Sequence, residues 1–155
     1  MSEGTSGNEN VGPVLEKLDE AECLRLIAPG GIGRIAFIGR YGLTVLPVNY
    51  KLHDGAIVFR TAQDSPTGED LSTGIAHAEF QVAFEIDQIN PETRDGWSVL
   101  IHGPAHHMAS DDERAAVAAS EVAPWPRGVH EHAIRITPTA ITGRRLSHPG
   151  AVGSS

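Results

Sequence analysis

Residues 45–65, VLPVNYKLHDGAIVFRTAQDS, contain two strand-like runs joined by a turn and followed by a polar loop. Residues 43–50 include β-branched and aromatic side chains, and residues 56–61 form a second apolar run. Between them, His53-Asp54-Gly55 supplies the residues that a tight β-hairpin prefers. The stretch therefore predicts two antiparallel strands that lead into a polar loop of a size to hold a phosphate. This layout is typical of a nucleotide-type cofactor site on a β-sheet.

The rest of the chain continues this β pattern. Residues 80–86 alternate, with Phe80, Val82, Phe84 and Ile86 on one face, as in a half-buried strand. That strand is expected at residues 79–86, and further strands are expected at residues 33–38, 97–107, 131–137 and 140–145. Six or seven strands with few helices favour a small antiparallel β-barrel, because closing the sheet removes its exposed edges.

Only short helices are expected. Asp19 followed by Glu22 resembles a capping box, and the apolar residues after it have helical spacing until Pro29-Gly30-Gly31. Ser110 with Glu113 is a second capping-box match and predicts a helix to residue 120. Residues 68–77 are a third short candidate.

Composition sets the class of protein. The chain has 155 residues, of which 40% are hydrophobic and 21% charged, so it is expected to form one soluble domain at residues 14–146 between disordered tails at 1–13 and 147–155. A net charge of −8 argues against nucleic acid as a partner. Cys23 is the only cysteine, and no apolar run reaches the length of a membrane span or a signal peptide. A cytoplasmic protein with no membrane partner is expected.

Seven motifs in order carry a family resemblance: GRIAF (33–37), LPVNY (46–50), VFRTAQDS (58–65), VAFEID (82–87), GWSVLIHGPA (96–105), PW (124–125) and ITGRRL (141–146). Together they resemble the pyridoxamine 5′-phosphate oxidase-like family of FMN-binding proteins. The resemblance covers residues 18–146 and implies a mainly β fold, a six-stranded antiparallel split β-barrel with short helices. It also implies a homodimer with two FMN sites, each built from both subunits.

The resemblance assigns candidate cofactor-binding residues. By similarity, main-chain groups of the strand with Pro47, Val48 and Asn49 would meet the polar edge of the flavin ring. Two further groups of positions follow from the same resemblance: Arg60, Thr61 and Ser65 near the ring and phosphate, and, as partner-subunit or later contacts, Trp97, Ser98, Trp125 and Arg135. Without the resemblance, Trp97 and Trp125 would be read as core or interface residues.

The chain departs from the family directly after Ser65. Pro66 and Thr67 stand where such flavoproteins usually carry Arg or Lys against the phosphate. A charge-assisted hydrogen bond contributes roughly 1.5–3 kcal/mol, so the loss of one or two weakens FMN binding by about tenfold to several thousandfold. This departure bears on the cofactor more than on the fold.

The sequence thus leads to one main hypothesis and two alternatives. The main one is an FMN-dependent oxidoreductase or reductase that acts on a small molecule, with no residue identified as a general acid or base. The first alternative is a non-catalytic small-molecule-binding or interaction protein that no longer holds FMN tightly. The second is a relative that binds a deazaflavin or haem, for which His102 and His106 share one strand face, and His130 and His132 another. No set of metal ligands is recognised.

Overall fold

A computed structural model describes residues 13–39, 41–62, 80–107 and 131–148. Its elements, in chain order, are β1 (Val14–Leu18), α1 (Glu20–Ile27), β2 (Gly31–Gly39), β3 (Gly42–His53), β4 (Ala56–Ala62), β5 (Phe80–Ile89), β6 (Gly96–His107), β7 (Glu131–Ile136) and β8 (Ala140–Ser147). All of the expected strands are present, and β1 is a strand that the sequence analysis did not predict. The helices expected at 68–77 and 110–120 lie outside the described residues.

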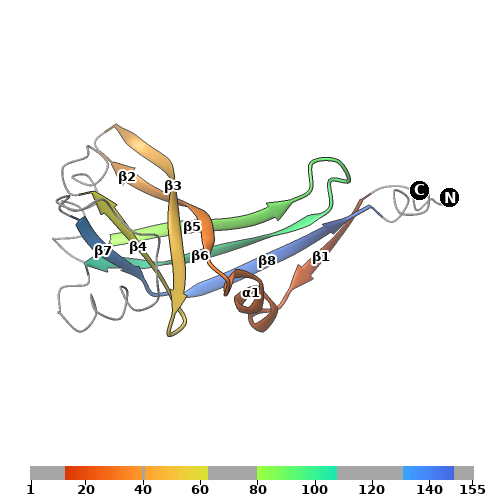
Figure 1. Ribbon diagram of the computed structural model, residues 1–155, viewed down its shortest axis with the longest axis horizontal. Coiled ribbons are helices and arrows are strands. Elements are labelled where there is room, and N and C mark those ends of the chain that lie inside the picture. Colours follow the sequence, from red (N-terminus) through yellow and green to blue (C-terminus); the bar gives the residue numbers. More distant parts are fainter. Residues whose placement is uncertain (1–12, 40, 63–79, 108–130, 149–155) are drawn as a thin grey trace.

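The strands form a closed barrel with an extension. The order β6–β5–β2–β3–β4–β7 returns to β6 through a second pairing of β6 with β7, so these six antiparallel strands form a ring. One edge of β6 is shared: Gly96–His102 pair with β8, and Ala105–His107 pair with β7. β8 and β1 therefore extend the sheet beyond the ring, as Figure 1 shows at the end opposite β4 and β7. The predicted split-barrel fold is confirmed.

The hairpin between β3 and β4 forms as its turn residues predict. His53 pairs with Ala56, which leaves Asp54 and Gly55 as a two-residue loop. Both have positive φ, 51° and 74°, as a type I′ turn requires. This turn sets the register of β3 on β4, and so determines where the paired part of the hairpin ends.

Helix α1 begins as its cap predicts. The Asp19 side chain accepts a hydrogen bond from the Glu22 amide at 2.8 Å, which satisfies one amide of the first turn. The Glu22 carboxylate bonds Arg25 and also Arg145 of β8, at 3.0 Å. Glu22 therefore ties the helix to the sheet extension.

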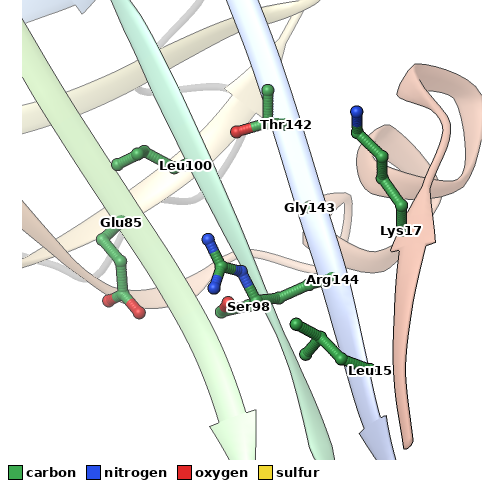
Figure 2. A pocket seen from close by; sticks show the side chains of 8 residues that line it. All are labelled: Leu15, Lys17, Glu85, Ser98, Leu100, Thr142, Gly143 and Arg144. Carbon is green, nitrogen blue, oxygen red and sulfur yellow. The ribbon is translucent and has the colours of Figure 1, made fainter.

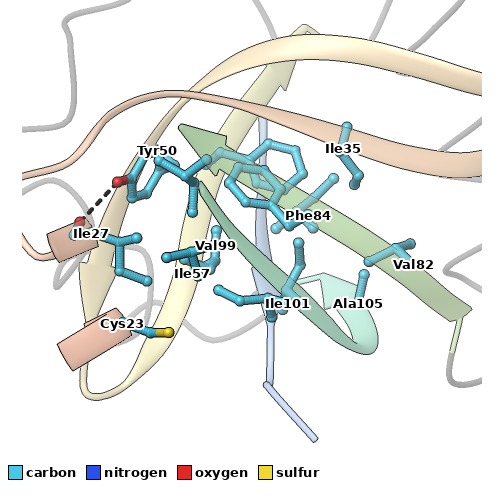
Figure 3. Close-up of a cluster of buried hydrophobic side chains, with 14 of the residues drawn as sticks. Cys23, Ile27, Ile35, Tyr50, Ile57, Val82, Phe84, Val99, Ile101 and Ala105 are labelled. Carbon is cyan, nitrogen blue, oxygen red and sulfur yellow. Dashed lines mark hydrogen bonds between the residues drawn. The ribbon is translucent and has the colours of Figure 1, made fainter. Parts of the chain in front are cut away.

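The core lies inside the ring and beneath α1. Phe84 of β5 contacts Tyr50 edge to face at 5.6 Å between ring centroids, and Phe59 of β4 in a stacked arrangement at 6.1 Å. The Tyr50 hydroxyl donates a hydrogen bond of 2.8 Å to the carbonyl of Ile27 at the end of α1 (Figure 3). Burial raises the pKa of Tyr50 to about 12. The aromatic cluster thus joins β3, β4, β5 and the helix.

Candidate functional site

The first feature of the site is an opening in the sheet between β3 and β4. Their ladder ends at the Tyr50–Phe59 pair. Beyond it, residues 42–49 of β3 pair with β2, and residues 60–62 of β4 pair with β7. Among the described residues, the edge of β3 that faces β4 therefore has no backbone partner over residues 42–49, and its outward amide and carbonyl groups make no ladder hydrogen bonds with them.

Alternation along β3 decides what this edge presents. Pro47 and Asn49 are exposed on the outer face of the sheet. Val48 points the other way and packs against the core, so it offers a ligand its main chain. The sequence assigns Pro47, Val48 and Asn49 to one cofactor contact. In the structure, Pro47 and Asn49 present their side chains on the outer face, whereas Val48 anchors the strand to the core.

Two predicted basic residues come together beside the opening, on the paired strands β4 and β7. Arg60 on β4 stands opposite Ala133 of β7, and Arg135 stands opposite Val58. The two arginines are thus diagonal neighbours on one face, which in an antiparallel pair places their positions roughly 7–8 Å apart. Thr61 follows in β4, opposite His132. Arg60 and Arg135, 75 residues apart in the chain, form the cationic side of this site.

The remaining predicted residues divide differently. Trp97 and Ser98 are adjacent on β6, and the Trp97 side chain packs against the core. Ser98 therefore lies on the opposite, outer face. Ser65 and Trp125 lie outside the described residues. Because strand neighbours face opposite ways, Trp97 and Ser98 do not present their side chains on the same surface.

A second site, which the sequence analysis did not identify, lies on the outer face of the sheet extension. We call it the β1–β8 hollow; its cavity volume is about 620 Å³, within the range of small-molecule sites. Its lining residues come from β1, β5, β6 and β8 (Figure 2): Leu15, Lys17, Glu85, Ser98, Leu100, Thr142, Gly143 and Arg144. Ser98 is the member that the sequence assigned to a cofactor. The other lining residues are brought together by the register of strands that are far apart in the sequence, and local sequence patterns do not reveal that register.

Glu85, which lines the hollow, belongs to an acidic pair with Asp87. Arg34 of β2 contacts Glu85 at 3.3 Å and Asp87 at 3.4 Å. Burial raises the pKa of Glu85 to about 7, with a further contribution from Asp87, against the opposing effect of Arg34. Glu85 also lines an adjacent cavity of about 400 Å³ beside Val45 and Leu100. A carboxyl group on this face thus changes charge near neutral pH.

The positions of the histidines and of helix α1 bear on two other possibilities, a metal site and a membrane-spanning helix. His106 lies opposite Arg135, and His102 opposite Ala140. Within the described ranges, no group of three or more His, Cys, Asp or Glu side chains is placed to hold a metal ion. The described part of the chain also has no helix of the length and hydrophobicity needed to cross a membrane.

Comparisons with known proteins agree with this architecture. A model of the pyridoxamine 5′-phosphate oxidase family matches residues 19–145. An uncharacterized protein of Mycobacterium tuberculosis is 32% identical over 130 residues, which cover 84% of each chain.

Two solved structures share the fold. The FAD-binding protein from Mycobacterium smegmatis superposes with a TM-score of 0.67 at 30% identity, over 83% of this chain and 98% of that chain. An FAD-binding protein from Mesorhizobium loti has a TM-score of 0.65 over 88% of this chain and 99% of that chain, and at 18% identity it supports the fold alone. The barrel, the match over most of the chain and the sequence identity together show that this chain belongs to the pyridoxamine 5′-phosphate oxidase family.

Proposed function

We propose that this protein binds a flavin nucleotide, FMN by the family pattern, and acts as a flavin-dependent oxidoreductase or reductase on a small molecule. The observation that carries the proposal is the open edge of β3, which lies beside the strand bearing Arg60. The M. smegmatis relative, at 30% identity, is an FAD-binding protein, which supports a flavin ligand. FAD is therefore the second candidate cofactor.

The residues at the opening fit a flavin nucleotide. The ring of a flavin has a polar edge of carbonyl and N–H groups, which the free amides and carbonyls of β3 match. Its phosphate requires cationic hydrogen-bond donors, and Arg60 and Arg135 lie together on one face. A guanidinium at either position would offset the absence of Arg or Lys at Pro66 and Thr67.

The protein would position the cofactor rather than perform the chemistry itself. A bound flavin supplies hydride or electron transfer. Val48 and Tyr50 pack against the core, so the open edge of β3 is held in place before a ligand arrives. Asn49, exposed on that edge, adds a side-chain amide that can orient a polar group.

A homodimer is the second part of the proposal. Leu43 and Ile38 are directly paired across β3 and β2 and are 80% and 62% exposed, and Val45 on the same face is 61% exposed. Leu100 of β6 lies farther along this face. Exposed apolar residues gathered on one sheet face are typical of an interface, and a second copy of the chain would cover them. It would also bring its own Ser98 to the flavin site.

Absorption spectroscopy tests cofactor binding directly. The purified protein, loaded with FMN or FAD and then desalted, is expected to retain the visible flavin bands. Arg60→Ala should weaken FMN binding at least tenfold, the loss expected for one charge-assisted contact. Arg94→Ala, in the exposed turn between β5 and β6, should leave it unchanged. Retained flavin that a hydride donor bleaches and a small-molecule acceptor restores would support the oxidoreductase assignment.

Two outcomes would count against the proposal. A spectrum of protein alone after loading would favour the non-catalytic barrel, and a haem band would favour the haem-binding alternative.

For the dimer, sedimentation should give twice the monomer mass, and Leu43→Lys should shift it toward the monomer. If the wild-type protein is a monomer at micromolar concentration, the flavin site cannot be built from two subunits as proposed.

A further inference from the structure

The β1–β8 hollow contains a row of polar side chains that the strand register brings together. Ser98 of β6 stands opposite Arg144 of β8, and Arg144 stands opposite Lys17 of β1. In the next row, Thr142 of β8 stands opposite Leu100. Figure 2 shows the Arg144 side chain extending over β6 beside Ser98. Two cations and two hydroxyl groups therefore line one side of the hollow.

The pairing of Lys17 with Arg144 is unfavourable by itself. Like charges directly opposite one another on antiparallel strands destabilise the pair. Neither side chain has an ion pair with a carboxylate among the residues that the structure describes. The adjacent Arg145, by contrast, contacts Glu22 at 3.0 Å and Glu16 at 3.7 Å. An anion between Lys17 and Arg144 would relieve their repulsion.

The chemistry of the row selects the kind of anion. A guanidinium offers paired N–H donors, an ammonium adds a compact charge, and the two hydroxyls add neutral donors. This set suits a tetrahedral group with several oxygens and about two negative charges. Glu85 is the acidic residue in the lining, and Arg34 contacts it from the side away from Lys17. The lining therefore carries more positive than negative charge.

We propose that the β1–β8 hollow binds the phosphate group of a small molecule, with Lys17 and Arg144 as its cationic ligands and Ser98 and Thr142 as hydroxyl donors. Two ligands supply this chemistry. One is the flavin nucleotide held mainly by the other subunit of a dimer, whose phosphate would then be shared between this hollow and the Arg60 and Arg135 side of that subunit. The other is a separate phosphate ester. The first source rests on the proposed function, whereas the phosphate site itself does not.

Binding measurements on the full chain with FMN, riboflavin and ADP separate these sources, because riboflavin lacks the phosphate. Arg144→Gln should weaken binding of the phosphorylated ligand about 10- to 100-fold, and Lys17→Gln/Arg144→Gln further, with no loss for riboflavin. Arg94→Gln, which removes one positive charge from the exposed turn between β5 and β6, is the matched control. Inorganic phosphate should raise the melting temperature of the wild type but not of the double variant.

Each outcome supports or overturns the phosphate site. Weaker FMN with unchanged riboflavin supports the flavin source, and weaker ADP with unchanged FMN supports a separate phosphate ester. If no flavin binds but ADP binding depends on Arg144, the proposed function fails and the phosphate site stands. Equal losses for FMN and riboflavin, equal losses in Arg94→Gln, or no loss for any ligand would overturn it.

Discussion

Gly143 of β8 lies against helix α1, and an added methyl group there tests how closely the helix packs on the sheet. Gly143 is opposite Leu18 of β1 and Val99 of β6. A Cβ atom at this position would overlap the Cys23 sulfur and lie 3.2 Å from the Ser98 carbonyl oxygen. Gly143 has no positive φ, so Gly143→Ala would act through packing and not through backbone strain.

The expected cost follows from this overlap. Cys23 is fully buried, so the helix must shift or the sulfur must move into packed surroundings. Overpacking of this kind costs about 1–3 kcal/mol. In a chain of 155 residues, each kcal/mol lowers the melting temperature by about 2–4 °C. Gly143→Ala should therefore lower it by roughly 2–12 °C.

A second substitution identifies the cause. Cys23→Ala removes the overlapping sulfur, so the double variant Cys23→Ala/Gly143→Ala should lose less stability than the sum of the single losses, by about 0.5–3 kcal/mol. Cys23→Ser keeps an atom at the same place and should give little relief. Urea unfolding followed by circular dichroism measures all of these variants. Additive losses, or a fully stable Gly143→Ala, would refute the packing of α1 on β8 described above.

Three further predictions concern single side chains. Tyr50→Phe removes one of two hydrogen bonds to the Ile27 carbonyl, which also accepts from the amide of Gly30, so unfolding free energy should fall by only about 0.5–1.5 kcal/mol; a loss above about 3 kcal/mol in urea titrations would contradict this. Hydrogen bonds from Arg25 and Arg145 lower the pKa of Glu22 from 4.5 to about 2, so its stabilisation is present above pH 4.5 and is lost as the pH falls toward 2; Glu22→Gln should flatten this acid limb of melting temperature against pH. Burial raises the pKa of Glu85 from 4.5 to about 7, so folding retains its proton and stability should fall as the pH rises from 4.5 through 7; Glu85→Gln should remove this slope, and an unchanged slope would assign it to another group.

Local signals were sufficient for much of the fold. Asp54-Gly55 accepts positive φ, so the hairpin of β3 and β4 and its register could be predicted from two residues. The alternation from Val82 to Ile86 identified β5, because a strand with one buried face repeats every two residues. Asp19 likewise marked the start of α1 through a hydrogen bond three residues away.

The sequence could not supply the contacts between distant segments. β1 has five residues, of which Leu18 alone is buried, so it shows no alternating pattern, and it is a strand because β8 pairs with it some 130 residues later. Two residues that were predicted together as cofactor contacts also lie on opposite faces of β6: Trp97 packs on the core, and Ser98 lines the β1–β8 hollow. Side-chain direction depends on register, which local composition does not encode.

The amino-acid sequence by itself determined the family, the strand content and the residues that carry charge, because turn preferences, period-two alternation and ordered motifs are local properties. The tertiary structure decided where the β3–β4 ladder opens, that Arg60 and Arg135 share one face, and that Lys17 faces Arg144. These features depend on how the barrel closes and on where along β6 the paired strand changes from β8 to β7. Closure sets many strand registers at once, and no single segment contains the information to fix them.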